Sequence, residues 1–190
     1  MWWSANKSEM FFFVLVLGLF ASLLAQFQLG AVPPWGARIF LMPAIFLYGA
    51  LSLSTNSMLV LAFIAGFMWD IMHVQWVDGA MELGVGWSGF MYAVLGALMS
   101  GFRPLFLRGR WEVHCLFSGF ATVVLVLGEY LMLSVRREPL RFEFSALVWG
   151  RILGAGVITL VAAPFVFGVL EYLARLVGHK HYRPDRISDS

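Results

Sequence analysis

The sequence predicts an all-α integral membrane protein, a single transmembrane domain in which six helices form one bundle. Two features of composition support this prediction. Apolar residues make up 61% of the 190 residues, and the mean hydropathy is +0.81. Charged residues make up 13%, about half of the roughly 25% that soluble domains carry. A third feature is length, because several apolar runs reach about 20 residues, which is what a helix needs to cross the bilayer core.

Six apolar runs separated by short polar joins are the expected spans. They cover residues 10–29, 38–53, 57–76, 85–102, 113–135 and 145–173. The first run is longer than the apolar core of a secretory signal, so we expect it to be retained. Near the end of the sixth run, Glu171 and Arg175 are spaced for an ion pair within one helix. A polar, basic tail at 178–190 is typical of a segment that lies on the lipid surface.

Lysine and arginine are distributed unevenly between the two sides of the predicted bundle. With the N-terminus placed inside, eight of the 13 lysines and arginines fall in cytoplasmic segments and five fall on the outer side. Cytoplasmic loops of membrane proteins carry the excess of these residues. The distribution therefore predicts that both termini are cytoplasmic.

The third run carries ionisable residues well inside its apolar length. Asp70 lies one helical turn after Gly66 on the same helix face, and His73 lies nearly one turn further out. A charge at bilayer depth costs about 2.5–3.5 kcal/mol, so it normally faces a protein interior or a wet cavity. Gly66 would let another helix come close to the acid. After this run the chain becomes polar and glycine-rich, and Gly84 leads into the fourth run.

Glu129 and Arg151 lie at mirrored positions in the fifth and sixth runs. Each is 11 residues from Leu140 in the connecting loop, which predicts a similar depth, in the same outer half as Asp70 and His73. Three interpretations remain open for this layer: a buried ion pair of Arg151 with Glu129 or Asp70, a ligand-contacting or proton-carrying site, and a partner-binding site. We expect the donor to Asp70 to come from Arg151, His73 or the membrane helix of a partner.

Motifs of common enzymes and metal sites are absent from the sequence. It contains no GxxxxGK[ST], HExxH, CxxC or GxSxG pattern. Cys115 is the single cysteine, and the four histidines do not share a helix face. We therefore expect no enzymatic activity, no catalytic residue, no metal site and no cofactor. The basic tail favours membrane lipids over nucleic acid as its contact.

A series of motifs runs through the membrane part of the chain between residues 41 and 176. These motifs are Pro43 in the second run, Gly66-Phe67-Met68-Trp69-Asp70-Ile71 in the third, Gly84 opening the fourth, Gly128-Glu129-Tyr130 late in the fifth, and Pro164-Phe165 in the sixth. Together with six short-looped spans and inside termini, they resemble the MreD family of bacterial rod-shape-determining membrane proteins. Two features of this chain differ from the pattern of the family. Its hydrophilic tail is longer than expected for a family member, and Arg151 corresponds to none of the family motifs.

The resemblance implies a non-enzymatic scaffold of the bacterial cell-elongation machinery, which governs rod shape and peptidoglycan synthesis at the inner (cytoplasmic) membrane. Members of this family pair with MreC, a bitopic protein with a periplasmic domain. They work beside the glycosyltransferase RodA, a class B penicillin-binding protein and the actin-like MreB. This interpretation requires no small-molecule substrate.

The runner-up interpretation follows from the same resemblance. The fold of MreD is thought to be similar to the substrate-binding S-components of energy-coupling-factor vitamin transporters, whose outer half holds a small-molecule pocket. In such a protein Ala21-x-x-x-Ala25 would resemble the docking face for the transport subunit. The two interpretations differ in what fills the outer half, a partner helix or a vitamin. A third class, an ion-coupled carrier using Asp70 and Glu129, lacks the duplicated halves typical of carriers.

Overall fold

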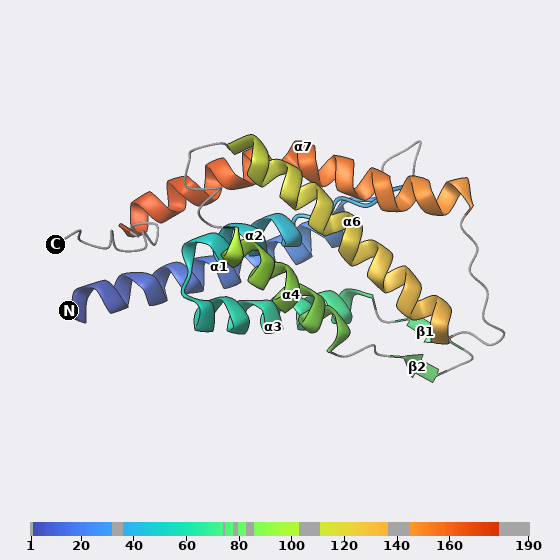
Figure 1. Cartoon of the computed structure of the whole chain (residues 1–190), viewed down its shortest axis with the longest axis horizontal. Coiled ribbons are helices and arrows are strands. Elements are labelled where there is room, and N and C mark those ends of the chain that lie inside the picture. The colour runs from blue at the N-terminus through green and yellow to red at the C-terminus, as the bar shows by residue number, and fades with distance from the viewer. Residues whose placement is uncertain are drawn as a thin grey trace.

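The structure is a computed structural model. It describes residues 2–31, 36–73, 75–77, 80–82, 86–102, 111–136 and 145–178. These residues form six helices and one short two-stranded hairpin (Figure 1). The elements are α1 (Trp2–Gln28), α2 (Met42–Ser52), α3 (Thr55–Met72), β1 (Gln75–Val77), β2 (Ala80–Glu82), α4 (Trp87–Gly101), α6 (Trp111–Arg136) and α7 (Ala146–Val177). The described part of the chain is nearly all helical, as the predicted all-α class requires.

Four of these helices are long and apolar enough to cross a membrane. The qualifying segments are Lys7–Gln26, Thr55–Met72, Glu112–Met132 and Ala146–Val177. The two others are shorter, with 11 residues in α2 and 15 in α4, or about 17 Å and 23 Å of helix. The structure is thus that expected of an all-α membrane protein, and the crossing of all six helices stays a prediction.

The predicted end of the third run and the predicted start of the fourth run were wrong. Helix α3 ends at Met72 rather than at residue 76, and the following residues form strand β1, in which Trp76 pairs with Met81 of β2. Helix α4 begins at Trp87 rather than at residue 85. The glycine-rich, polar sequence between the two helices suits a hairpin and turns better than helix. Gly84, which we expected to open the fourth span, lies outside the described residues.

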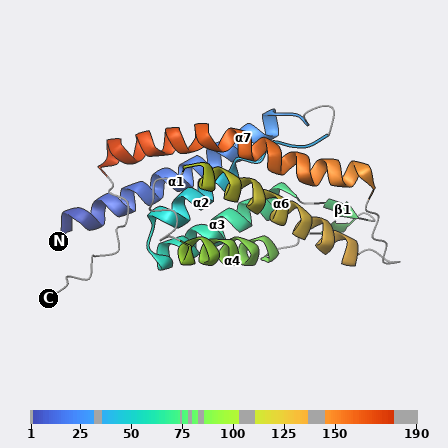
Figure 2. The ribbon, with the colours of Figure 1, turned by 45° about the horizontal axis from the view of Figure 1, so that its top comes forward.

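The second run is shorter than predicted because residues 38–41 lie outside the helix. Helix α2 starts at Met42, with Pro43 in its first turn, where a missing N–H costs nothing and the fixed φ suits the helix. Ten of its 11 residues are buried, so α2 is apolar all round, as a helix in the centre of a bundle is. It contacts α1, α3, α4, α6 and α7, and Figure 2 shows it between α7 on one side and α3 and α4 on the other.

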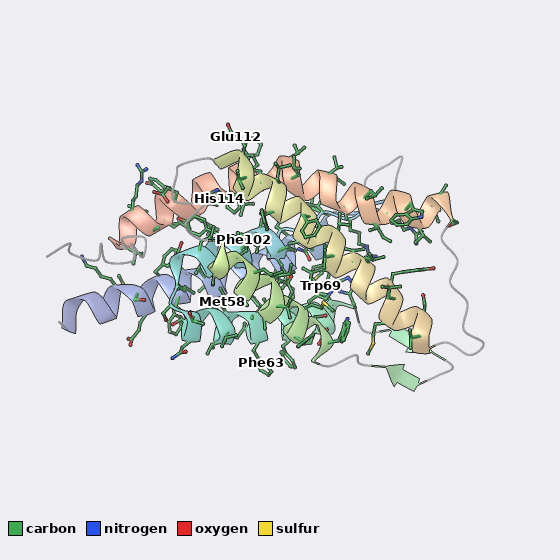
Figure 3. The ribbon with its side chains drawn as sticks, viewed as in Figure 1. Met58, Phe63, Trp69, Phe102, Glu112 and His114 are labelled. Atoms are coloured by element: carbon green, nitrogen blue, oxygen red, sulfur yellow. The ribbon has the colours of Figure 1, made fainter. Side chains whose placement is uncertain are left out.

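The surrounding helices turn some apolar side chains inward and others outward. Figure 3 shows Met58 and Trp69 pointing into the bundle and Phe63 pointing away from it. Met58 is fully buried, whereas Phe63 is 68% exposed. Large exposed apolar side chains also line α1 and α7. Soluble monomers rarely expose such contiguous apolar surface, so these faces suit contact with lipid or with a membrane partner.

The first and last helices meet at one end of the bundle (Figure 1). The Lys7 ammonium lies against Gly178, which caps α7 in a left-handed conformation with φ of 69°. A cation at this position interacts favourably with the unpaired carbonyls at the end of a helix. The start of α1 and the end of α7 therefore lie on the same side, as the predicted topology requires. That this side is cytoplasmic stays a prediction.

Candidate functional site

The predicted polar residues of the third and fifth runs gather near the end of α3. Asp70 and His73 from α3 and its cap lie close to Glu129 of α6. We call these three residues the Asp70 layer. Gly66 lies one turn earlier on α3, at the contact with α4. These three residues come together, although their partners differ from those expected.

Gly66 allows two backbones to touch. A Cβ built on Gly66 would overlap the Cα and N atoms of Gly89 and would lie 2.7 Å from the carbonyl carbon of Ser88. All three are main-chain atoms, so no side-chain rotation could make room. Only glycine fits at this position without separating α3 from α4. The helix approach predicted from Gly66 is confirmed, and the approaching helix is α4.

Asp70 is buried and binds the start of α4. Its Oδ2 accepts a hydrogen bond of 2.8 Å from the main-chain N–H of Gly86. Gly86 is the residue before the first turn of α4 and has φ of 99°, a conformation that favours glycine. An anion at a helix N-terminus is stabilised by unpaired N–H groups and by the helix dipole. The donor predicted from Arg151, His73 or a partner is therefore supplied by the backbone of α4.

His73 ends α3 and turns its ring back over the last helical turn. Its Nδ1 lies 3.0 Å from the carbonyl oxygen of Trp69, and its ring stacks on the Trp69 indole with centroids 4.8 Å apart. The other ring nitrogen, Nε2, lies 3.6 Å from Oε2 of Glu129. Glu129 also accepts a hydrogen bond from the Trp69 side chain. These contacts connect the C-terminal end of α3 to α6.

Aromatic rings fill the bundle around the Asp70 layer. Trp69 packs against Phe40 at 4.8 Å and against Tyr92 at 6.1 Å between ring centroids. Phe46 meets Tyr92 edge-on at 4.9 Å. All four side chains are at most 6% exposed. The interior at this height is therefore packed with rings from α2, α3, α4 and the segment before α2.

Tyr92 carries a polar group into this packed region. Its side chain is fully buried, and its hydroxyl has no hydrogen-bond partner in the part of the chain that the structure describes. It interacts electrostatically with Asp70 and with Glu129. A buried hydroxyl without a partner is uncommon and calls for a specific explanation, such as an ordered water.

Arg151 does not join the Asp70 layer, so the predicted buried pair with Glu129 or Asp70 was wrong. Its side chain is exposed, and its Nε lies beside the Gly36 turn. The carboxylate of Glu129 is instead shared with His73 and Trp69. Equal numbers of residues from a loop place two residues at a similar height along their helices. They do not determine the direction in which each side chain points around its helix axis.

Pro164 lies within α7, far along the chain from the Asp70 layer. The helix continues through it from Ala146 to Val177. Proline has no N–H to donate to the carbonyl four residues earlier, and its ring crowds that carbonyl, so it usually bends a helix. Pro164 thus belongs to the shape of α7 rather than to the polar site.

Three participants were missed by sequence reasoning. They are Trp69, Tyr92 and Arg38, of which Arg38 is exposed and acts electrostatically on both His73 and Glu129. Trp69 lies deep within the predicted third span. A buried tryptophan usually finds a hydrogen-bond partner for its N–H, so its position was a usable signal. Tyr92 and Arg38 gave no such signal, because each is ordinary for its position in an apolar run or at a helix start.

Comparisons of the chain with known protein families, with curated proteins and with solved structures found no match. The resemblance to MreD therefore stays a prediction. Within the described residues, no three His, Cys, Asp or Glu side chains come together as a metal site would require. What the Asp70 layer can do chemically is fix the mutual position of three helices, α3, α4 and α6, and hold protons.

Proposed function

We propose that the chain is a non-enzymatic membrane scaffold similar to MreD. It lies in the bacterial inner membrane with both termini cytoplasmic, and it binds a bitopic protein similar to MreC. In this role it works beside RodA, a class B penicillin-binding protein and MreB in the elongation machinery. Membrane lipids are its other contacts, and no nucleic acid is involved.

The packing around Trp69 is the observation that carries this proposal. A substrate-binding S-component needs an open space in its outer half to hold a vitamin, whereas a scaffold needs a rigid, filled interior. Phe40, Phe46, Trp69 and Tyr92 occupy the centre of the bundle at the height of the Asp70 layer. Ligand pockets are concave volumes of about 300–1,000 Å³, and rings at these separations leave little room for one.

The internal use of the Asp70 layer also supports a scaffold. Asp70 accepts a hydrogen bond from the backbone of α4, and Glu129 contacts His73 and accepts a hydrogen bond from Trp69. Polar groups that bind a substrate would instead be left for that substrate. In a scaffold, the same contacts set the outer surfaces of α3, α4 and α6 in a fixed arrangement for a partner helix.

The proposal is tested in a rod-shaped bacterium that depends on the chain. Wild-type protein should co-purify with a bitopic membrane protein, and its depletion should round the cells without changing vitamin uptake. Gly66→Ala, which forces α3 from α4, should lose both the partner and the rod shape. Gly89→Ala, whose new Cβ meets no atom within 4 Å, is the matched control and should keep both. Wild type that carries no bitopic partner would contradict the proposal.

One observation favours the S-component as a second candidate. The Tyr92 hydroxyl and the Gln26 amide are buried without a hydrogen-bond partner in the described structure, as groups reserved for a polar ligand would be. Purified wild-type protein would then retain a vitamin in a one-to-one ratio, and Tyr92→Phe would release it. The same preparation serves both tests, because mass spectrometry identifies either a bound vitamin or a bound protein.

A further inference from the structure

We propose that Glu129 is a proton-binding site: it is held as a neutral carboxylic acid whose O–H faces Nε2 of His73. The chemical ligand of this site is a single proton on Oε2 of Glu129, which lies 3.6 Å from Nε2 of His73, just beyond the usual length of a hydrogen bond. This inference is independent of the scaffold function, because it follows from the contacts of three residues.

The tautomer of His73 is fixed by its contact with the backbone of α3. Its Nδ1 lies 3.0 Å from the carbonyl oxygen of Trp69. A carbonyl oxygen can only accept, so Nδ1 must carry a hydrogen and donate it. In a neutral imidazole one ring nitrogen is the donor and the other is the acceptor. Nε2 of neutral His73 therefore presents a lone pair toward Glu129.

The carboxyl group of Glu129 faces this lone pair of His73. An ionised carboxylate has only acceptor oxygens, so it would set a lone pair against the lone pair of Nε2. That contact needs a proton, held either by Glu129 as an acid or by His73 as an imidazolium. The Trp69 side chain hydrogen-bonds the carboxyl group as well, and indole N–H is a donor. A carboxylic acid matches both neighbours, with O–H toward Nε2 and its carbonyl oxygen toward Trp69.

The surroundings of Glu129 and His73 favour the neutral acid over an ion pair. Glu129 falls inside the apolar segment Glu112–Met132, and its side chain and that of His73 are only 20% and 17% exposed. Withdrawing two charges from water costs several kcal/mol per ion before their attraction returns any of it. The neutral pair keeps the same contact without that cost.

The charged and titratable groups around the pair act in both directions. Asp70 of α3 disfavours a second carboxylate at Glu129, whereas Arg38 before α2 favours it. Arg38 is exposed, so solvent weakens its effect, while Asp70 is buried and the Glu129 side chain is 20% exposed. Tyr92 of α4 adds a neutral hydroxyl, and Arg151 of α7 points to the Gly36 turn instead. The balance leaves the proton on Glu129.

Infrared spectroscopy of the full chain in lipid nanodiscs tests the carboxyl group. At pH 6, which lies between the ordinary pKa values of about 4.3 for Glu and 6.5 for His, an isolated Glu would be ionised. We expect wild type to show the C=O stretch of a protonated carboxyl that disappears in Glu129→Gln. Glu112→Gln removes an exposed carboxyl from the start of the same helix and should keep the band. Wild type without a band attributable to Glu129 would overturn the proposal.

Nitrogen NMR of labelled histidine in the wild-type protein gives a second answer that needs no folded Glu129 variant. At the same pH, an isolated imidazole would be mostly protonated on both nitrogens. We expect the His73 signal to be that of a neutral ring with hydrogen on Nδ1 and none on Nε2. An imidazolium signal from His73 at pH 6 would show an ion pair instead and would refute the neutral acid.

Discussion

Two helix contacts, one at each end of the bundle, are built on opposite principles. Where α3 meets α4, backbone lies on backbone: Gly66 touches Gly89, and the carboxylate of Asp70 holds a main-chain N–H. Where α2 meets α7, the link is made by side chains, with the Tyr48 hydroxyl donating to Glu171 over 2.9 Å. A backbone contact has no rotamers with which to adjust, so we expect it to tolerate far less change than a side-chain contact.

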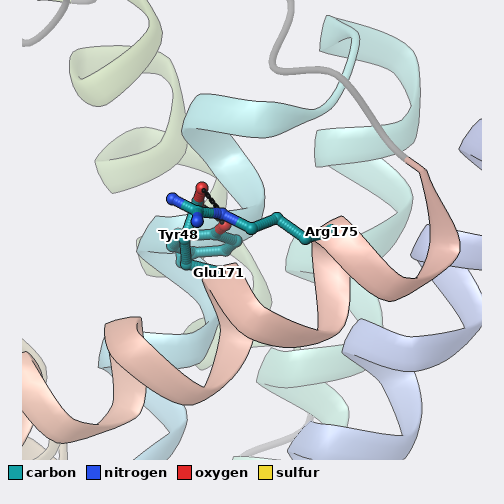
Figure 4. A network of polar contacts seen from close by, with 3 residues as sticks. All are labelled: Tyr48, Glu171 and Arg175. Atoms are coloured by element: carbon teal, nitrogen blue, oxygen red, sulfur yellow. Dashed lines mark hydrogen bonds and ion pairs between the residues drawn. The ribbon is translucent and has the colours of Figure 1, made fainter.

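The α2–α7 contact can be followed in Figure 4. Glu171 accepts from Tyr48 through one oxygen and from Nε of Arg175 through the other, at 3.1 Å. The ring of Tyr48 also stacks on Phe167 of α7, with centroids 5.9 Å apart. The pair of Glu171 and Arg175 predicted from their spacing is confirmed. Each member of this network has freedom about its own side-chain bonds, which the glycine contact lacks.

The largest effect is expected from Gly66→Ala. The new methyl group would occupy the position of the Gly89 backbone, so α3 and α4 must move apart. Overpacking of a tight core costs about 1–3 kcal/mol, and we expect this substitution to reach the upper part of that range. The measurement is the free energy of unfolding in detergent micelles, together with the yield of monodisperse protein.

Gly89→Ala is the matched control for that prediction. It adds the same methyl group on the other side of the same helix contact, yet the new Cβ meets no atom within 4 Å. We expect its stability to remain close to that of wild type or to rise slightly, because alanine favours helix over glycine by about 1 kcal/mol. Equal losses for the two variants would show that α3 and α4 do not meet through Gly66.

Asp70→Leu should have the next largest effect. Leucine resembles aspartate in shape but cannot accept from the N–H of Gly86, so α4 loses its cap. Loss of a helix N-cap costs about 0.5–2 kcal/mol. Asp70→Asn keeps an accepting oxygen and should lose less than half as much, which is the control. If Asn and Leu were equally harmful in thermal unfolding, the negative charge rather than the hydrogen bond would be what stabilises α4.

The sequence predicted one side of the α3–α4 contact and could not predict the other. Gly66 and Asp70 are four apart, and helix periodicity alone puts them on one face. The helix that approaches Gly66 could not be predicted, because every non-proline residue carries the same main-chain N–H donor. A carboxylate that binds Gly86 therefore leaves no trace at Gly86, beyond the glycine-rich character of the whole segment.

The depth of the residues in the Asp70 layer could be predicted, but the direction in which their side chains point could not. Counting residues from the loop placed Glu129 and Arg151 at similar depth, and Glu129 does lie near Asp70. Depth follows from the rise of 1.5 Å per residue, which a sequence contains. The direction of a side chain around the helix depends on how the helix is rotated in the bundle. That rotation placed Arg151 at the surface and His73 against Glu129.

A moderate effect is expected from Tyr48→Phe at the α2–α7 contact. The substitution removes only the hydroxyl and keeps the ring stacked on Phe167. Net contributions of single hydrogen bonds are about 0.5–1.5 kcal/mol, and Glu171 can turn its oxygen to water because it is partly exposed. We expect a loss of about 1 kcal/mol or less in unfolding free energy. A loss as large as that of Gly66→Ala would remove the distinction between the two contacts.

The smallest effect is expected from Arg175→Gln in the same network. Glu171 and Arg175 lie four residues apart on α7, and the Arg175 side chain is 76% exposed. Exposed pairs at this spacing contribute about 0.2–0.5 kcal/mol, less as salt rises. Combining Arg175→Gln with Tyr48→Phe isolates the coupling between the two donors of Glu171. Because Arg175 also orients the carboxylate toward Tyr48, the double variant should lose less than the sum of the single losses. Strictly additive losses would mean that Glu171 serves its two partners independently.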